Sequence, residues 1–325
     1  MPEISASPFV FRHYRLEASQ DFHRLARLLQ AVEAYDQDGE DVSEAALLAS
    51  LKWQGHDPQK DRWLAFHRDR LDEAIGYTFI FTQSPFRAAL HVAVHPDWRR
   101  RGLGQALFVR NLEEARELGV RQILTNTNAR NTAAVAFLHR QGFQLAGEAW
   151  SLHLPAGLPV AEPEWPAGFT VRRYVETPDL TLLANLLNQC YADRWGHTEN
   201  TPGAVDEARV ARSLEYWRPE DLLIAFAPGG QAVGVCENRP ATDPAEDHLL
   251  GAPGIAPAYR SPELYRALTL TAARCLRRYG PQAIRLESYG DDEDVIAIYQ
   301  ELGFSLDGQF LSYLYDLKQG TSGSD

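Results

Sequence analysis

Cysteine is scarce in this sequence. Three cysteines occur among 325 residues, Cys190, Cys236 and Cys275, and none of them belongs to a CxxC pair. An odd and scattered set, with no histidine at ligand spacing, indicates neither a disulfide framework nor a zinc centre. We therefore expect a reducing compartment and no bound metal.

Long hydrophobic runs and an excess of basic residues are also missing. No window approaches the roughly 18 uninterrupted apolar residues of a membrane span, and the beginning of the sequence lacks the basic and apolar segments of a signal peptide. Acidic residues outnumber basic ones by 44 to 32, which gives a formal net charge of -12. This charge disfavours nucleic acids and membranes as partners and favours an amine. We expect a cytoplasmic protein.

The composition is that of a folded chain with room for two domains. Hydrophobic residues make up 45% and charged residues 23% of the 325 positions, as in globular proteins with domains of roughly 100 to 200 residues. Residues 155–168 contain four prolines, which would interrupt a helix or an inner strand. We predict a first domain over residues 1–154, a linker over 155–168, a second domain over 169–318 and a flexible tail over 319–325.

The two halves share landmarks in the same order. Residues 9–14 (FVFRHY) match residues 169–174 (FTVRRY). Further on, Val94 aligns with Ile255 and Gly142 with Gly303, both at an offset of 161 residues. Ordered landmarks at a constant offset predict a duplication.

Each half is predicted to have an α/β fold. In the first half, apolar periodicity predicts helices over residues 21–35, 43–53, 102–118 and 132–141, and strands over 9–16, 63–67, 74–82, 88–94, 122–127 and 144–154. We expect a mixed central sheet flanked by helices, with a strand–loop–helix unit at its centre.

The loop of this central unit has the composition of a diphosphate site. The predicted strand over residues 88–94 leads into HPDWRRRGLGQ, which opens directly into a helix. Gly102 and Gly104 let backbone N–H groups approach an anion, the helix N-terminus adds partial positive charge, and three consecutive arginines add full charges. The loop is not a Walker loop, because no Gly-Lys-Ser/Thr follows, and it lacks the third glycine of a dinucleotide fingerprint.

The pattern Val-x-Pro-x-x-Arg-x-x-Gly-x-Gly, together with the later stretch from Asn131 to Phe143, resembles the GNAT superfamily of N-acetyltransferases. The resemblance spans most of each half. It implies an α/β (α+β) fold of two tandem GNAT-like acyl-CoA N-acyltransferase domains, with acetyl-CoA as co-substrate and no metal. The residues that it implies for acetyl-CoA binding are Val92, Ala93, Val94, Arg99, Arg100, Arg101, Gly102, Leu103, Gly104, Gln105 and Asn131.

The sequence departs from this family at the catalytic positions. In the first half, Asn126 stands where members often have a glutamate base, and Leu138 stands where many have a general-acid tyrosine. In the second half Glu287 and Tyr299 occupy these positions, but Glu263 replaces the first loop glycine and would repel a diphosphate. The sequence therefore does not decide which residues are catalytic, and the candidates are Asn126, Glu287 and Tyr299. A solvated strand residue is the alternative for Glu287, and core packing is the alternative for Tyr299.

Acidic residues follow the first predicted helix, where the family builds acceptor recognition. Glu33 and Asp36 are candidates for binding an amine, and a solvated loop is the alternative. The later acidic run over residues 291–294 is expected to stabilise a helix N-terminus.

The sequence thus predicts an N-acetyltransferase in which a primary amine of a small molecule or peptide attacks the thioester directly. No Cys–His or Ser–His pair is positioned for a covalent intermediate. The alternative is a non-catalytic acyl-CoA-binding sensor or scaffold protein. The acceptor and the oligomeric state stay open.

Overall fold

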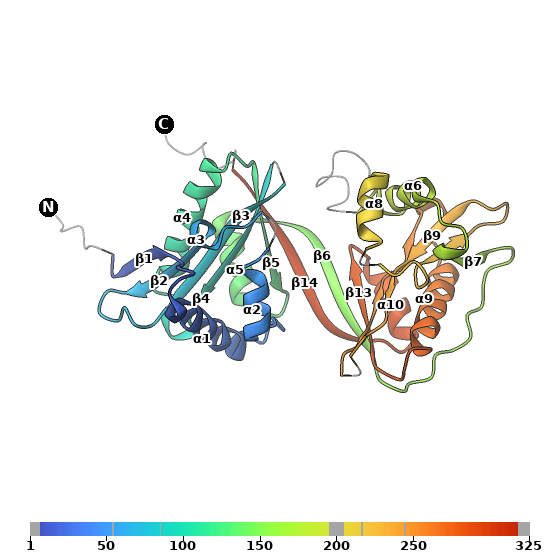
Figure 1. The fold of residues 1–325 in the computed structure, drawn as a ribbon, viewed down its shortest axis with the longest axis horizontal. Helices are drawn as coiled ribbons and strands as arrows, with labels where there is room; N and C mark the ends of the chain where they lie inside the picture. The colour runs from blue at the N-terminus through green and yellow to red at the C-terminus, as the bar shows by residue number, and fades with distance from the viewer. Residues whose placement is uncertain are drawn as a thin grey trace. The chain divides into compact units, whose positions relative to one another are not determined.

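A computed structural model of the chain describes residues 7–317, except residues 54, 85, 195–204, 216 and 244. The chain divides into two compact units, which we call unit 1 (residues 1–146 and 311–325) and unit 2 (residues 147–310) (Figure 1). The tail predicted over residues 319–325 lies outside the described residues. Among the helices that the structure describes, none has the length and apolar character needed to cross a membrane.

Unit 1 is a mixed sheet flanked by helices, as predicted. Its strands follow the order β1 (Phe9–His13), β2 (Arg62–His67), β3 (Gly76–Ser84), β4 (Arg87–Val94), β5 (Gln122–Asn128) and the end of β14 (Ser305–Asp316). Its helices are α1 (Ser19–Asp36), α2 (Glu44–Ser50), α3 (Pro58–Asp61), α4 (Leu103–Glu117) and α5 (Thr132–Gln141), with a 3-10 turn, η1 (Pro96–Trp98), before α4.

Helices cover both faces of this sheet. α1 packs on one face through Leu25 in a cluster that includes Ala93 of β4. α4 and α5 pack on the other face through Phe108 and Leu138, in a cluster that includes Leu90 of β4. Because successive strand residues point to opposite faces, β4 contributes to both halves of the core. The strand that leads into the arginine-rich loop is therefore held from both sides.

The parallel pairing of β4 with β5 is short. It runs from Arg87–Gln122 to Ala89–Leu124, and no later pair joins these strands within the described residues. β4 nevertheless continues to Val94 and β5 to Asn128. The two strands therefore separate toward their carboxyl ends, and their facing edges carry backbone groups that do not pair with each other.

Unit 2 has a related arrangement. One sheet has the order β14, β6 (Gln144–Leu154), β13 (Ile284–Tyr289), β11 (His248–Gly251) and β10 (Asn238–Arg239), and the other has the order β12 (Gly254–Ile255), β9 (Ala232–Cys236), β8 (Leu223–Phe226) and β7 (Thr170–Arg173). The helices are α6 (Leu180–Tyr191), α8 (Glu207–Ser213), α9 (Pro262–Arg277) and α10 (Glu293–Glu301), with 3-10 turns η2 (Tyr174–Glu176) and η3 (Pro257–Tyr259). The chain leaves one sheet for the other between β11, which pairs with β13, and β12, which pairs with β9.

The proline-rich stretch lies along unit 2. Val160 and Trp165 pack against the unit 2 core, and Arg274 donates a hydrogen bond to the Val160 carbonyl at 3.1 Å. The compact units also divide two long strands. Residues 149–154 of β6 pair with β13 in unit 2, whereas the end of β14 belongs to unit 1, where the buried Tyr313 packs with the α4 and α5 residues. Each unit therefore contains a strand segment from the other half of the sequence.

Candidate functional site

The loop between β4 and α4 contains two residues in the left-handed region. Gly102 has a φ of 83° and Arg100 a φ of 61°. A non-glycine residue in this region is uncommon and costs on the order of 1–3 kcal/mol, and such strain concentrates at ligand sites. Gly102 caps α4 without a side-chain hydrogen bond, and no acidic residue lies in the first turn. The N–H groups and the positive dipole end of α4 are thus open to an anion.

Arg99 is bound within unit 1. Its Nε donates to the Val94 carbonyl at 3.0 Å, and its two Nη atoms lie 2.6 and 2.7 Å from the Asp36 carboxylate oxygens. The hydrogen bonds to Asp36 raise the pKa of Arg99, although partial burial acts in the opposite direction. The structure therefore brings the predicted cofactor residue Arg99 and the predicted acceptor residue Asp36 into one ion pair, which joins the end of β4 to the end of α1.

The loop residues after Arg99 include three exposed side chains, those of Arg100, Arg101 and Gln105. The Arg101 guanidinium lies 4.9 Å from the centre of the Trp98 ring, a cation–π distance that leaves the charge at the surface. Leu103 is buried with Leu107 on the sheet side of α4, so that only its backbone faces the loop. The loop therefore offers backbone N–H groups and two exposed guanidinium groups.

The residues that flank the open end of β4 are close-packed. Val92 and Val94 lie against the α4 side, and Ala93 is buried on the α1 side. A Cβ atom at Gly104 would lie 3.5 Å from the Phe137 ring and 3.8 Å from Val94, which are ordinary contact distances. The absence of a side chain at Gly104 leaves space between the first turn of α4 and β4. A Cβ atom there would cause no steric clash.

Asn131 caps α5 and also holds the acidic loop that follows α1. Its Oδ1 accepts a hydrogen bond from the Ala134 N–H at 3.1 Å, and its Nδ2 donates to Asp38 Oδ2 at 3.0 Å. The Asn128 amide donates to the Asp38 carbonyl at 3.2 Å. Asp38 is thereby fixed at the junction of β5 and α5, near the end of the strand that separates from β4.

Asp38 has the most unusual environment among the acidic residues of this loop. Its Oδ1 is buried and has no hydrogen-bond partner among the described residues. Burial raises the pKa of Asp38, the hydrogen bond from Asn131 lowers it, and the charge of Asp36 raises it, with a net increase. The sequence shows the acidic run, but no local pattern singles out this carboxylate, because its partners Asn128 and Asn131 lie 90 and 93 positions away.

Two other predicted residues have structural partners in unit 1. Glu33 accepts a hydrogen bond from the Gly39 N–H at 2.8 Å, which shapes the acidic loop. Asn126 is exposed on β5, and its Oδ1 accepts a hydrogen bond from the Ser312 hydroxyl at 2.8 Å.

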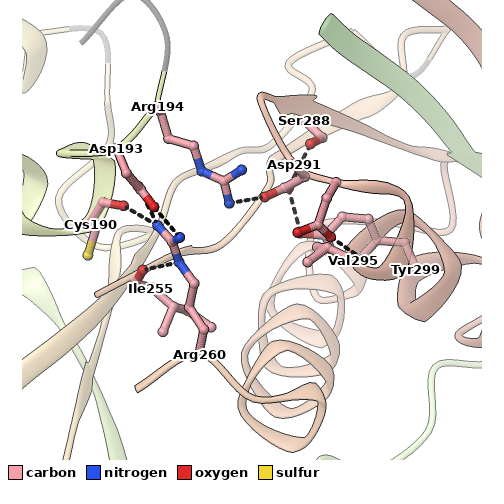
Figure 2. Close-up of polar contacts among 10 residues, drawn as sticks. Cys190, Asp193, Arg194, Ile255, Arg260, Ser288, Asp291, Val295 and Tyr299 are labelled. Atoms are coloured by element: carbon pink, nitrogen blue, oxygen red, sulfur yellow. Dashed lines mark hydrogen bonds and ion pairs between the residues drawn. The ribbon is translucent and has the colours of Figure 1, made fainter. Parts of the chain in front are cut away.

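Unit 2 contains the counterpart of the Arg99 ion pair (Figure 2). Arg260 donates from Nε to the Ile255 carbonyl at 3.1 Å, and its Nη atoms lie 2.5 and 2.8 Å from the Asp193 carboxylate. A further bond reaches the Cys190 carbonyl at 3.1 Å. This arginine thus joins a strand end to a helix end in both units.

The helix that follows Arg260 differs from α4 at its N-terminus. α9 begins at Pro262, the Ser261 hydroxyl accepts a hydrogen bond from the Leu264 N–H at 3.3 Å, and Glu263 lies in the first turn. Hydrogen bonds from its own N–H and from Ser261 lower the pKa of Glu263. The N-terminus of α9 is therefore occupied by a hydroxyl and a carboxylate of the chain itself.

The two catalytic candidates of unit 2 lie in different surroundings. Tyr299 is fully buried, which raises its pKa well above the ordinary value, and its hydroxyl donates to Asp291 Oδ2 at 3.1 Å. Asp291 also accepts hydrogen bonds from Ser288 at 2.7 Å and from Arg194 at 2.7 Å (Figure 2). Glu287 is half exposed and lies 3.4 Å from Arg285.

No sequence pattern indicates the buried ion pair between Asp291 and Arg194. The acidic run over residues 291–294 was expected to stabilise a helix N-terminus, and Asp292 does cap α10 through the Val295 N–H at 3.0 Å. The neighbouring side chain of Asp291 is instead buried within unit 2. Periodicity within the run does not separate these two roles.

A cavity of about 200 Å³ lies in unit 2 beside these groups. It is lined by Cys190, Tyr191, Arg194, residues 251–255, Glu287, Tyr289 and Asp291. It therefore lies where the chain leaves β11 for β12 while β13 continues.

Known proteins resemble this chain in sequence and in fold. The family model of the acetyltransferase (GNAT) family matches residues 25–143. The mycothiol acetyltransferase of Stackebrandtia nassauensis is 27% identical over 300 residues, which cover 90% of this chain and 94% of that protein.

Two solved structures share the fold across nearly the whole chain. A GCN5-related N-acetyltransferase from Sphaerobacter thermophilus gives a TM-score of 0.76 at 21% identity and covers 96% of both chains. A tandem GNAT protein from the clavulanic acid biosynthesis pathway gives a TM-score of 0.65 at 17% identity and covers 98% of this chain and 100% of that one. The family match therefore identifies residues 25–143 as a domain of the acetyltransferase (GNAT) family, and the solved structures show that the chain has the fold of a tandem GNAT protein.

Proposed function

We propose that this chain transfers the acetyl group of acetyl-CoA to a primary amine of a small molecule or peptide, and that unit 1 holds the acetyl-CoA. The contrast between two helix N-termini carries this assignment. α4 begins at Gly102 with no side-chain cap and no acid in its first turn, whereas α9 begins with the Ser261 cap and the Glu263 carboxylate. A diphosphate is negatively charged, so it is favoured at α4 and disfavoured at α9.

Residues of unit 1 fit the parts of acetyl-CoA in their order along the chain. The backbone N–H groups from Gly102 to Gln105 and the exposed guanidinium groups of Arg100 and Arg101 would hold the diphosphate. Residues 92–94 would lie beside the pantetheine, where β4 has separated from β5. When bound there, acetyl-CoA supplies a reactive thioester at the opening between the strands. Arg99 acts as a positioning residue, since its guanidinium is bound to Asp36.

An ammonium ion must lose a proton before its nitrogen has a free lone pair and can attack the thioester carbonyl carbon. The attack forms the C–N bond and breaks the C–S bond, and the second proton that the nitrogen loses goes to the departing CoA thiolate. Asp38 supports the role of proton acceptor in unit 1, since its pKa is raised and it is fixed at the junction of β5 and α5. A carboxylate with a raised pKa is a better base at neutral pH than an ordinary one. We assign the proton to Asp38 Oδ1, the oxygen without a partner among the described residues.

The relatives named mycothiol acetyltransferase favour a small-molecule amine as the acceptor. Glu33 contributes negative charge beside Asp38, whereas the charge of Asp36 is compensated by its ion pair with Arg99. This charge attracts an ammonium ion to unit 1 before its proton is removed.

Release of free thiol from acetyl-CoA with a panel of small primary amines tests the proposal. We expect amine-dependent turnover that Gly104→Glu abolishes, because its carboxylate would enter the first turn of α4 beside the loop. Glu263→Gln in unit 2 serves as the matched control and should retain turnover. Tight acetyl-CoA binding without turnover on any amine would instead favour the non-catalytic sensor or scaffold.

A further inference from the structure

We propose that the cavity in unit 2 binds small primary ammonium compounds and does not transfer acetyl groups, an inference that rests on the proposed assignment of acetyl-CoA to unit 1. The cavity has a volume of about 200 Å³ and is lined by side chains from α6 and β13 and by the chain between β11 and β12.

By sequence offset, the cavity corresponds to the region of unit 1 in which β4 and β5 no longer pair. At the offset of 161 residues, Ile255 of its lining matches Val94, and Glu287 matches Asn126. The nearby N-terminus of α9 is already occupied by Ser261 and Glu263. Unit 2 has therefore kept the opening where an amine meets an acyl group and has closed the place for a diphosphate.

The charges of the lining favour a cation. Arg194 and Asp291 form an ion pair at 2.7 Å, with side chains only 13% and 5% exposed, so their charges compensate each other. Among the described residues of the lining, the Glu287 carboxylate is the remaining charge. Its partner outside the cavity, Arg285, is half exposed and 3.4 Å away, and an ion pair of this kind contributes little. An ammonium group entering the cavity would complete the charge balance.

Aromatic side chains support the same ligand class. Tyr191 and Tyr289 both line the cavity, and tyrosine rings attract ammonium ions through their π-electrons. A carboxylate combined with two tyrosines is a typical environment for an organic cation. Neutral ligands of the same shape gain neither interaction.

Among the described residues, neither the cysteine of the lining nor the nearby buried tyrosine is prepared for acyl transfer. Burial raises the pKa of the Cys190 thiol to about 12, so it stays protonated and is a poor nucleophile. The Tyr299 hydroxyl is engaged with Asp291. The buried groups of this region are thus committed to each other (Figure 2), which suits a fixed binding site.

The size of the cavity limits the ligand. With a volume of about 200 Å³, it has room for a small molecule. A short alkylammonium ion such as n-butylammonium fits this space, whereas acetyl-CoA does not.

Isothermal titration of the full-length protein, free of acetyl-CoA, tests the site with n-butylammonium chloride as the probe. Butan-1-ol, which has the same shape without the charge, is the control ligand. We expect saturable binding of n-butylammonium and none of butan-1-ol. Glu287→Gln should weaken the binding at least about fivefold, as loss of a charge-assisted hydrogen bond does. Glu263→Gln, which removes a carboxylate outside the lining of the same unit, should leave it unchanged.

Ala252→Leu provides a second variant, because it fills the cavity with a larger apolar side chain and should abolish binding. Glu287 is half exposed, so Glu287→Gln carries the test if the filled variant does not fold. Equal binding of butan-1-ol, insensitivity to Glu287→Gln, or absence of saturable n-butylammonium binding would each overturn the proposal.

Saturating acetyl-CoA should leave the affinity for n-butylammonium unchanged, and competition between them would show that the cavity belongs to the transfer site. Failure of acetyl-CoA to bind unit 1 would contradict the proposed function alone, since the titration without acetyl-CoA reports on the cavity directly.

Discussion

Replacing Asp36 with asparagine is expected to destabilise the protein more than the same change at Asp193, although both aspartates form two-point ion pairs with an arginine. The Arg99 pair has atom separations of 2.6 and 2.7 Å, and the Arg260 pair has separations of 2.5 and 2.8 Å. The arginine side chains are 25% and 24% exposed, but the Asp36 side chain is 9% exposed and the Asp193 side chain 49%. Burial of the carboxylate is thus the main difference.

The expected magnitudes follow from this difference in burial. Removing one partner of a buried pair leaves a charge without compensation and costs about 3–5 kcal/mol, and since Arg99 keeps partial contact with solvent, we expect about 2 kcal/mol for Asp36→Asn. An exposed pair contributes about 0.2–1 kcal/mol, so Asp193→Asn should cost less than about 1 kcal/mol.

Double-mutant cycles with Arg99→Gln and Arg260→Gln, measured by urea unfolding, separate each pair energy from the single changes. The Asp36–Arg99 coupling energy should exceed the Asp193–Arg260 coupling energy by about 1 kcal/mol and should respond less to added salt. Equal coupling energies, or a larger one for Asp193–Arg260, would refute the reasoning from burial.

Three further outcomes follow from the structure. Burial acts to raise the pKa of Asp21, but hydrogen bonds from Arg12, Arg24 and the Arg15 N–H lower it, and the net change is a decrease. The ionised carboxylate therefore contributes its full stability above the unfolded pKa of about 3.9. This contribution is lost as the pH falls through the lower folded pKa. Urea unfolding should show that Asp21→Asn costs about 3 kcal/mol at pH 7 and much less at acidic pH, and an equal cost at both would contradict this. Tyr313→Ala should cost about 3–5 kcal/mol and expose residues 122–128 to hydrogen exchange, whereas Leu306→Ala on the same strand, where the side chain is 40% exposed, should cost less than about 1 kcal/mol. Asp38→Asn should lower kcat/KM for the amine by about 10²-fold or more and flatten its acidic pH limb, with unchanged acetyl-CoA affinity; an unaltered pH profile would remove Asp38 from the mechanism.

Local signals predicted the elements that position the loop. The expected helices over residues 102–118 and 132–141 match α4 and α5, and the strand over residues 88–94 matches β4 within one residue. Apolar spacing and helix-ending glycines act within a few residues of each other, so one sequence is enough to read them. Ser43 caps α2 as expected, although that helix ends at Ser50, three residues before the predicted end.

Side-chain partners could not be read in the same way. Arg99 was expected at the diphosphate, yet its guanidinium is bound to Asp36, 63 positions earlier in the chain. The Asp38–Asn131 contact spans 93 positions. Composition gives the charge of such residues but does not state which opposite charge the fold brings to them.

The division of β6 and β14 between the compact units has no local signal either. A strand alternates in the same way whichever sheet it joins, so the segment over residues 144–154 reads as the closing strand of the first half. In the structure the first segment of unit 1 ends at Ala146, before the proline-rich stretch. The repeat boundaries at residues 154 and 169 stay a prediction about the origin of the halves.

The central claim is that acetyl-CoA binds unit 1 at the uncapped N-terminus of α4, and titration calorimetry with a reciprocal pair of variants tests it most directly. Gly102 and Glu263 lie at matching positions, 161 residues apart. A Cβ atom at Gly102 meets nothing within 4 Å, but the φ of 83° strains any residue with a side chain. Gly102→Ala therefore serves as the control for backbone strain, and Gly102→Glu adds the charge that opposes the diphosphate. We predict that Gly102→Glu weakens acetyl-CoA binding at least about tenfold and that Glu263→Gly leaves it unchanged. Undiminished binding to Gly102→Glu, together with altered binding to Glu263→Gly, would contradict it.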